Sequence, residues 1–594
     1  MPVWDFSGLY AAPAEPAIDA DLAAAEAEAA AFAALYEGKL AGLDAAGMLK
    51  AIETYEAISE RIGRVMSYVG LRNAQNVMDE SRAKALGDAH NRVTEISAPM
   101  VFFSLEINRL EDATLEAWFG ADAALARYRP FFDKIRASRP YQLSDELERF
   151  LHDQSVVGGS AWNRLFDETM AGLSFTVKGD GGAAETLTLE QTLTALNDAK
   201  RERRAAASAA LSEVFAANIK LFTRITNTLA KEKEIEDRWR KLPSPEAGRH
   251  LANQVEPEVV EALRDAVVAA YPRISHRYYA LKAKWLGLDK LQTWDRNAPL
   301  PETDDRKIPW AEARETVTAA YAEFAPEMAE IAGRFFDKGW IDAPSRQGKS
   351  PGAFAHPTVV SAHPFVMLNY LGKTRDVMTL AHELGHGVHQ VLAAEQGELL
   401  SSTPLTLAET ASVFGEMLTF KRLLAAAETP AKRKSLLAGK VEDMINTVVR
   451  QIAFYEFELR VHRARREGEL TPAALGEIWM GVQGESLGPA FEFNDGYKNF
   501  WAYIPHFIHS PFYVYAYAFG DGLVNALYAV YEERAKAGDA SFQAMYFDML
   551  RAGGSKRHKE LLAPFGLDAS DPAFWQKGLS VIDGMIGELE AMEG

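Results

Sequence analysis

The chain has 594 residues, 48% hydrophobic and 25% charged, a composition typical of a soluble globular protein with a sizeable core. Its 83 acidic and 64 basic residues give a formal net charge of −19, which argues against nucleic-acid binding and leaves no basic stripe for an anionic membrane. Because there is no cysteine, disulfides and thiolate metal ligands are excluded, and a reducing compartment such as the cytoplasm is expected.

Helical patterns dominate the chain from its first residues onward. Met1 to Phe6 show no basic segment followed by an apolar stretch, so no secretory signal peptide is expected. The alanine-rich run 19–40 carries too many acidic residues for a membrane span and predicts an amphipathic helix. Further helices are predicted over residues 44–67, 78–109, 186–237, 256–285, 310–337, 404–424, 438–467 and 513–537.

Strand signals are few. A hairpin is predicted where residues 174–177 and 186–188 flank a glycine-rich turn at 179–182. A second small sheet is predicted between Gly352 and Tyr370, and an edge strand there could receive an extended peptide. The best internal breaks are the loops 241–247 and 296–309. The fold is therefore expected to be mainly α.

His382, Glu383 and His386 form an HExxH motif within a stretch whose apolar pattern predicts a helix. Residues four apart are one turn apart, about 6 Å along the helix axis, so the two imidazoles can bind one metal ion. Glu383, one position along, is better suited to taking a proton from water than to sharing the metal. This pattern is typical of a zinc metallopeptidase.

A zinc site with two histidines and a water still needs a third protein ligand. His389 lies about 10 Å along the helix from the first histidine, so we expect it to pack or to support the site. Leu392 stands where an HExxHxxGxxH site would place its third histidine, which excludes that class. A glutamate from a second helix remains, and the predicted helix 404–424 carries Glu409 and Glu416 on one polar stripe. The other interpretation of this stripe is a solvated helix face.

A further polar stripe is predicted near residue 510, where His506, His509, Tyr513 and Tyr517 are spaced by three, four and four. In a helix these side chains would share one face, although Pro511 makes a helix start at that point an alternative. Such a face can donate hydrogen bonds to an oxyanion. The other interpretation is an aromatic stripe that packs in the core.

Several of these segments resemble the oligoendopeptidase F branch of the thimet oligopeptidase-like zinc peptidases. The likeness is dense in the second half of the chain, and the first half shares only a helical, acidic character. The segments that carry it are 352–354, 368–370, 382–389, 408–412, 450–458, 504–507 and 512–518. The resemblance implies two helical halves enclosing a deep substrate channel, with the small β-sheet next to the HExxH helix. It divides the chain into an N-terminal helical region, 1–200, and a catalytic region, 201–594.

Carried over by position, the resemblance implies one Zn²⁺ ion bound by His382, His386 and Glu409. Glu383 is then the general base, and Glu416 orients one of the ligands.

In the same family a histidine and a tyrosine from the region near residue 510 stabilise the tetrahedral intermediate. His506 with Tyr513 is the predicted pair, and Tyr517 is the next candidate. His356 and His363, before the HExxH helix, are expected to be structural residues or to line the substrate channel.

The predicted function is a cytoplasmic zinc endopeptidase that hydrolyses internal bonds of short oligopeptides and has no nucleic-acid or membrane partner. Folded proteins are not expected to fit, and the peptide ends are expected to need no anchor. One alternative is an all-α zinc carboxypeptidase, which would need a positive group for the free C-terminal carboxylate. The other is a non-catalytic peptide-binding relative, against which the intact Glu383 argues. The oligomeric state is left open.

Overall fold

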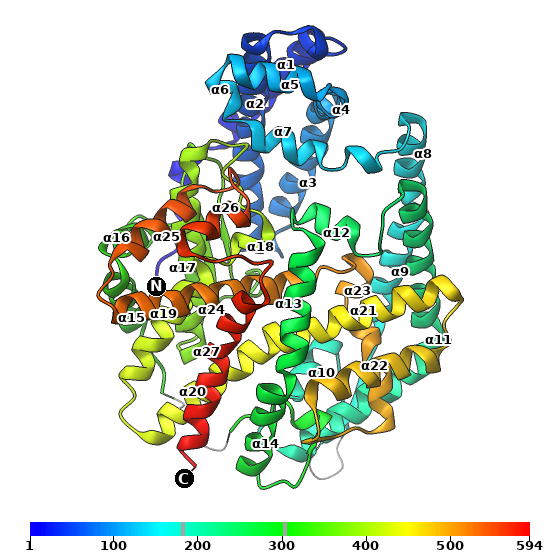
Figure 1. Ribbon diagram of the computed structural model, residues 1–594, viewed down its shortest axis with the longest axis vertical. Coiled ribbons are helices and arrows are strands. Elements are labelled where there is room, and N and C mark those ends of the chain that lie inside the picture. Colours follow the sequence, from blue (N-terminus) through cyan, green and yellow to red (C-terminus); the bar gives the residue numbers. More distant parts are fainter. Residues whose placement is uncertain (180–183, 301–305, 594) are drawn as a thin grey trace. The chain divides into compact units, whose positions relative to one another are not determined.

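The computed structural model describes residues 1–179, 184–300 and 306–593, and helices make up most of it (Figure 1). The predicted mainly α fold is confirmed. The chain forms two compact units, each assembled from segments far apart in sequence. Unit 1 comprises Met1–Pro140, Asp305–Ala426 and Val530–Leu567, and unit 2 comprises Tyr141–Asp304, Ala427–Ala529 and Asp568–Gly594. The division into regions 1–200 and 201–594 and the substrate channel stay predictions.

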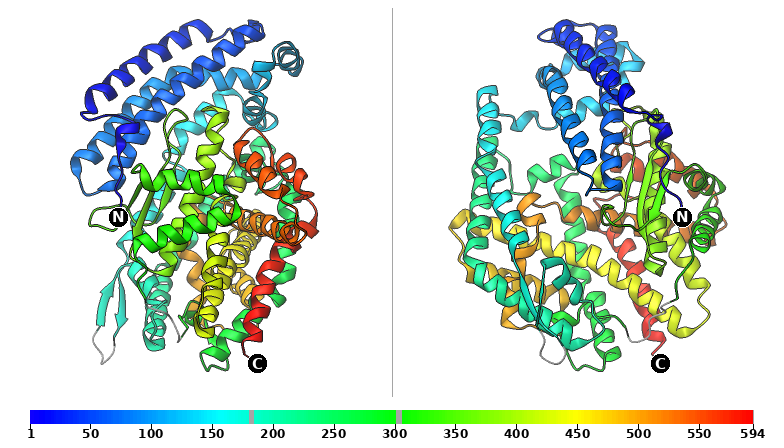
Figure 2. Two further views of the ribbon diagram at one scale, coloured as in Figure 1. Left: turned by 90° about the vertical axis from the view of Figure 1, so that its left-hand side faces the viewer. Right: turned by 180° about the vertical axis from the view of Figure 1, so that it is seen from behind.

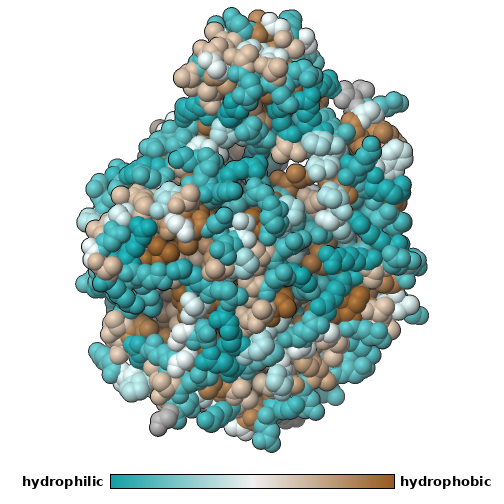
Figure 3. All heavy atoms as spheres, in the orientation of Figure 1, coloured by the Kyte–Doolittle hydropathy of each residue, from teal (hydrophilic) through white to brown (hydrophobic). Residues whose placement is uncertain are grey.

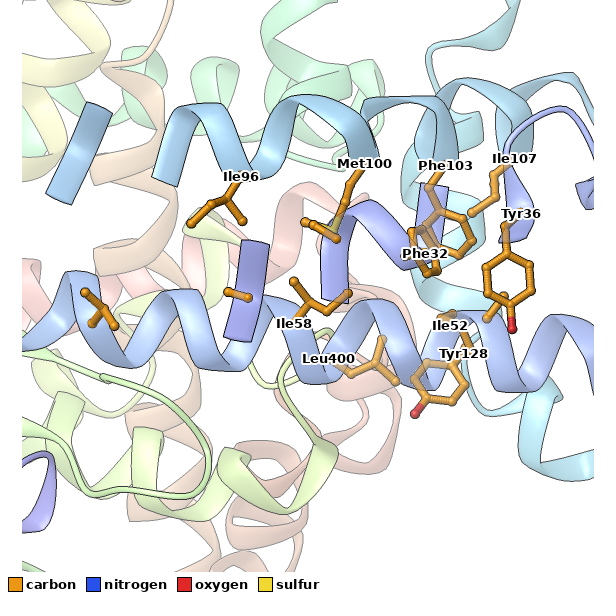
Figure 4. Close-up of a cluster of buried hydrophobic side chains, with 14 of the residues drawn as sticks. Phe32, Tyr36, Ile52, Ile58, Ile96, Met100, Phe103, Ile107, Tyr128 and Leu400 are labelled. Carbon is orange, nitrogen blue, oxygen red and sulfur yellow. The ribbon is translucent and has the colours of Figure 1, made fainter. Parts of the chain in front are cut away.

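The N-terminal part of unit 1 is a group of helices around one apolar core (Figure 4). Its helices are α1 Glu15–Tyr36, α2 Ala45–Gln75, α3 Glu80–Ser97, α4 Val101–Arg109, α5 Asp112–Ala121, α6 Ala123–Ala126 and α7 Arg129–Arg136. Phe32 and Phe103 meet edge to face in this core, at a centroid distance of 5.3 Å. The predicted helix 78–109 is interrupted by the 3-10 turn Ala98–Met100, because Pro99 cannot continue the hydrogen-bond ladder.

The rest of unit 1 combines helices with a three-stranded sheet. Its elements are α15 Trp310–Phe324, α16 Pro326–Asp337, β4 Ile341–Pro344, β5 Phe354–His356, β6 Phe365–Tyr370, α17 Thr374–Ala393, α18 Leu405–Ala408, α19 Ser412–Ala425, α25 Ser541–Arg551 and α26 His558–Leu562. Central β6 runs parallel to β4 and antiparallel to β5 (Figure 2). This confirms the sheet predicted between residues 352 and 370. Edge strand β5 packs next to α17, where Gln390 donates a 3.4 Å hydrogen bond to the carbonyl of Ala355.

Unit 2 contains longer helices and two small strand pairs. Its elements are α8 Asp145–Ser155, α9 Gly159–Gly172, β1 Phe175–Lys178, β2 Ala184–Leu187, α10 Leu189–Ala195, α11 Arg201–Arg240, α12 Ala247–Ala252, α13 Pro257–Ala270, α14 Ser275–Trp285, β3 Leu291–Gln292, α20 Pro430–Met444, α21 Arg450–Glu467, α22 Pro472–Leu487, β7 Phe491–Glu492, α23 His506–His509 and α27 Pro572–Ala591. Helix α24, Tyr515–Lys536, continues from unit 2 into unit 1.

The hairpin prediction in unit 2 is confirmed, since β1 and β2 pair antiparallel. Residues 180–182 of its predicted turn lie outside the described residues. The helix predicted over 186–237 was wrong at its start, because Thr188 and Gln191 form a capping box that begins the separate helix α10. The unit boundary between residues 304 and 305 falls in the predicted loop 296–309, of which residues 301–305 are not described.

Helix α11 is the one described helix that is long and apolar enough, by length and composition alone, to cross a membrane. A core helix of a water-soluble protein passes the same test. Within unit 2, α11 buries Leu211, Phe215 and Ile225. Hydrophilic residues predominate on the face of the molecule drawn in Figure 3.

Candidate functional site

The three residues predicted to bind zinc come together in unit 1. His382 and His386 lie one turn apart on α17, and Glu409 follows the last residue of α18. One carboxylate oxygen of Glu409 lies 3.4 Å from Nε2 of His382 and 3.5 Å from Nε2 of His386. Ligand atoms about 2.0–2.1 Å from a tetrahedral zinc ion are about 3.3 Å apart, so these separations fit one zinc. No other group in the described part of the chain brings three such residues together.

Helix α17 is well prepared to carry the two histidines. Asp376 in its first turn accepts hydrogen bonds from the backbone N–H groups of Leu371 and Lys373, at 2.8 and 3.0 Å. The helix predicted around the HExxH motif is thereby confirmed, and it begins at Thr374. His389, which sequence spacing placed outside the metal site, is buried, and its Nε2 lies 3.2 Å from the hydroxyl of Thr403.

The segment that carries Glu409 is not the continuous helix predicted over 404–424. The chain turns at residues 409–411 between α18 and α19. A methyl group on Gly385 would lie 2.3 Å from the carbonyl oxygen of Ala411 and 2.6 Å from Cα of Ser412. Only glycine at position 385 therefore lets this turn lie directly on α17, which brings the carboxylate to the histidines.

Two polar contacts orient the candidate metal ligands. The Ser412 hydroxyl donates a 2.6 Å hydrogen bond to the Glu409 oxygen that faces the histidines. Glu416, on α19, has an oxygen 3.2 Å from Nδ1 of His382. A proton on Nδ1 would then be donated to Glu416, which leaves the Nε2 lone pair for a metal. The geometry agrees with the orienting role that the resemblance implied for Glu416.

Electrostatics at the site follow from burial among carboxylates. Burial lowers the pKa of His386, which favours the neutral form that binds metal. Burial acts in the same direction on His382, but the hydrogen bond to Glu416 and the nearby carboxylates outweigh it and raise the pKa. Glu383 is only 7% exposed, and burial, helped by the charge of Glu409 and opposed by His382, raises its pKa to about 7. A carboxylate with this pKa can both accept and return a proton near neutral pH.

Two tyrosines that no sequence pattern indicates support the site from other helices. Tyr321 on α15 donates a hydrogen bond from its hydroxyl to the carbonyl of Ala381, and Gly415 provides the space, since a methyl there would lie 2.4 Å from that hydroxyl. Tyr546 on α25 donates a 2.8 Å hydrogen bond to the carbonyl of Thr410, next to Glu409. Both contacts join residues at least 60 positions apart, so no local sequence signal reveals them.

A cavity of about 460 Å³ lies beside His386 within unit 1. The loop 357–364, the C-terminal half of α17 and residues 401–403 line it. His363 lines this cavity and stacks on Trp340 at a centroid distance of 4.1 Å, while His356 accepts a 2.9 Å hydrogen bond from the backbone of Thr358. The volume of the cavity is large enough to take a substrate side chain.

The predicted oxyanion residues cluster in unit 2. Nε2 of His506 lies 3.2 Å from the hydroxyl of Tyr517, and the His506 and Tyr513 rings stack at 6.0 Å. They do not share one helix, because α23 ends at His509 and α24 begins at Tyr515; a new helix after the first histidines was the alternative that Pro511 left open. His509 points elsewhere, since its Nε2 lies 2.8 Å from the carboxylate of Asp167.

The link between α23 and α24 is fixed from two sides. Phe512 has a φ of 60°, in the left-handed region that a bulky residue rarely adopts. Its backbone N–H donates a 2.7 Å hydrogen bond to buried Glu458, and Arg249 donates one of 3.2 Å to the carbonyl of Pro511. These contacts hold Tyr513 in place.

Comparisons with known proteins agree with this geometry. The family model "Peptidase family M3" matches residues 195–581, more than half of the chain, and the model "Oligopeptidase F" matches residues 106–175. Oligopeptidase PepF of Bacillus subtilis (strain 168) is 28% identical over 94% of this chain and 82% of its own length. An oligoendopeptidase F homolog of Lactococcus lactis subsp. lactis (strain IL1403) is 25% identical over 99% of this chain and 97% of its own length.

Solved structures show the same fold. Oligoendopeptidase F from Enterococcus faecium superposes with a TM-score of 0.72 at 23% identity, covering 97% of this chain and 99% of its own. PZ peptidase A with an inhibitor superposes with a TM-score of 0.71 at 16% identity, covering 98% of both chains. The chain therefore belongs to peptidase family M3, in the oligoendopeptidase F branch, and is a metalloendopeptidase.

Proposed function

We propose that the protein is a zinc-dependent endopeptidase that cleaves internal peptide bonds of short oligopeptides. The observation that carries the proposal is the convergence of His382, His386 and Glu409, whose ligand atoms all lie within 4.8 Å of one another. Two imidazoles and one carboxylate are a donor set of catalytic zinc sites. Such sites leave the fourth coordination position open for water and substrate. Zinc bound by these residues would lower the pKa of a water molecule and polarise the scissile carbonyl.

Proton transfer falls to Glu383. Buried one position along the helix from His382, it can accept a proton from the attacking water and give that proton to the leaving amine. Glu416 keeps His382 in the tautomer that presents Nε2, as the 3.2 Å contact indicates.

Negative charge that develops on the carbonyl oxygen needs hydrogen-bond donors. We propose His506 and Tyr513 for this role, with Tyr517 next to them, because the three side chains gather in one cluster. Burial, together with the charge of Arg450, lowers the pKa of His506, which favours a neutral imidazole with one N–H to donate.

Peptide substrates have a place to lie in unit 1. The edge strand β5 can pair with an extended peptide, and the cavity beside His386 can take one of its side chains. The names of the relatives support oligopeptides as the substrate class. The net charge of −19 and the absence of cysteine support a cytoplasmic enzyme without a nucleic-acid or membrane partner.

The test is digestion of a defined set of oligopeptides, with the products identified by mass. We expect internal cuts, loss of activity with a chelator and recovery with one equivalent of zinc. A stable folded domain should remain intact. Activity that survives complete metal removal would contradict the zinc proposal, and removal of single C-terminal residues alone would favour the carboxypeptidase.

A further inference from the structure

Two arginines of unit 2 lie close together without a carboxylate of their own. Arg296 follows the short 3-10 helix Thr293–Asp295, and Arg450 is the first residue of α21. In both side chains the Nε atom is buried and has no hydrogen-bond partner in the described part of the chain. Burial and the neighbouring charge of Arg296 lower the pKa of Arg450 below its ordinary value. The two positive charges therefore repel each other in a place that is poorly hydrated.

The groups around the pair do not neutralise it. Glu442 contributes a negative charge near Arg296, but its carboxylate is bound by the ammonium of Lys282 and by the hydroxyl of Tyr278, the latter at 2.8 Å. The remaining partners are aromatic. Arg450 donates a 3.3 Å hydrogen bond to the hydroxyl of Tyr503 and lies over the ring of Phe454, at 5.0 Å.

Arg204 offers a comparison, since its buried Nε also has no partner in the described part of the chain but its guanidinium has a carboxylate. Arg204, in the same unit, is buried and forms a 2.9 Å ion pair with Asp295. Leaving two guanidinium groups unpaired is costly, because each has lost water without gaining a counter-charge. Arg296 and Arg450 each keep part of their surface exposed to solvent. Their planar forks match the two oxygens of a carboxylate.

The backbone next to Arg450 is unusual as well. Residues Ile445–Val449 form a π-helix between α20 and α21. Such a turn adds a residue to the helical repeat and re-aims the side chains that follow, and it is frequent at functional sites. The charge of Arg450 also reaches His506, whose pKa it helps to lower. An anion bound at Arg450 would thus lie within electrostatic range of the proposed oxyanion residues.

We infer that Arg296 and Arg450 form a binding site for a carboxylate of the peptide substrate, in the first place its C-terminal carboxylate. The inference rests on the proposed peptidase function and adds to it an anchor for one end of the peptide. It differs from the expectation drawn from the sequence, in which the peptide ends needed no anchor. An acidic side chain of the peptide carries the same chemistry and is the second source to be tested.

The experiment measures peptide binding in the Glu383→Gln background, loaded with zinc, so that turnover does not interfere. One oligopeptide is titrated calorimetrically as its free acid and as its C-terminal amide. A second pair, both amides, carries glutamate or glutamine at an internal position. The variants are Arg296→Gln, Arg450→Gln and the milder Arg450→Lys, each checked for native circular dichroism. Arg460→Gln is the matched control, because Arg460 lies on the same helix but is paired with Glu485 at 2.7 Å.

We expect the free acid to bind at least about tenfold more tightly than the amide, since charge-assisted hydrogen bonds are lost with the amide. This ratio should fall toward one in Arg296→Gln and Arg450→Gln and stay unchanged in Arg460→Gln. A preference for glutamate over glutamine that the same variants remove would support the site with a side chain as its source. Equal binding within both pairs, or preferences that survive both substitutions, would overturn the inference. Failure of the wild-type enzyme with zinc to cleave peptides would instead contradict the proposed function, because these ratios need no catalysis.

Discussion

Glu458 is a buried carboxyl group whose replacement by glutamine should change the stability of the protein in a pH-dependent way. The side chain is 2% exposed on α21, and one oxygen accepts the 2.7 Å hydrogen bond from the backbone of Phe512. The other oxygen has no partner among the described residues. Burial, opposed by the Phe512 hydrogen bond and by the charges of Arg249 and Lys233, raises the pKa of Glu458 from 4.5 to about 8.

The sign of the effect follows from proton linkage. Below pH 4.5 the carboxyl group is protonated in both the folded and the unfolded protein, so it adds no pH-dependent cost. Between pH 4.5 and about 8 the unfolded chain ionises while the folded protein holds its proton, so folding is opposed increasingly as the pH rises. Above the folded pKa the cost is complete. It amounts to roughly 4 to 5 kcal/mol, since each pKa unit corresponds to about 1.4 kcal/mol.

Glutamine removes this cost because it does not ionise. Its amide oxygen can still accept the hydrogen bond from Phe512, and the loss of packing or hydrogen bonding around its NH₂ group is the same at every pH. Urea unfolding followed by tryptophan fluorescence, at pH 5 and pH 8, measures the difference between Glu458→Gln and the wild type. Relative to the wild type, we expect the free energy of unfolding of the variant to rise by roughly 3 kcal/mol more at pH 8 than at pH 5. Glu467→Gln, exposed at the end of the same helix, is the control. A gain independent of pH, or one larger at pH 5, would refute the reasoning.

Three further predictions concern the metal site. Glu383→Gln should retain zinc, measured by metal analysis, and lose about 10²–10⁴-fold in kcat, because the general base is lost while the ligands remain. Glu409→Ala should lose zinc to a competing chelator much more readily than Glu416→Ala. The Glu416→Ala change should weaken zinc binding by about 10–100-fold. Equal zinc retention by both variants would mean that the third ligand is misassigned. Gly385→Ala should lower both the zinc affinity and the unfolding temperature, since its methyl group would lie 2.3 Å from a carbonyl oxygen. The control Gly333→Ala, in α16, should lower neither, because there is open space around that position. Wild-type zinc affinity in Gly385→Ala would contradict the packing argument.

The parts of the site that could be predicted from the sequence are those that one element contains. His382 and His386 belong to a single helix, so a spacing of four residues is enough to place both imidazoles on one side of it. Strands β5 and β6 were also predicted, since both lie in one short segment before α17, whereas β4 lies outside the segment predicted to form the sheet. Here local periodicity and tertiary structure agree.

Long-range contacts explain what the sequence could not provide. Tyr546 supports the turn at Thr410 across 136 positions, and the left-handed backbone of Phe512 depends on Glu458, 54 positions away. Pattern recognition treats such residues as ordinary core. The proximity of Arg296 to Arg450 cannot be predicted for the same reason, since each is an ordinary basic residue in its own segment.

The error over residues 404–424 has a more specific cause. The apolar pattern of that segment is helical throughout, and a straight helix would have placed Glu409 and Glu416 on the same stripe. The chain instead turns at 409–411, because the carbonyl of Ala411 occupies the space that the missing side chain of Gly385 leaves on α17. The turn separates the two carboxylates, so that one reaches Nε2 of both histidines and the other contacts Nδ1 of His382. A glycine in the middle of the HExxH helix, which weakens that helix by about 1 kcal/mol, is therefore the condition for bringing the three candidate ligands together.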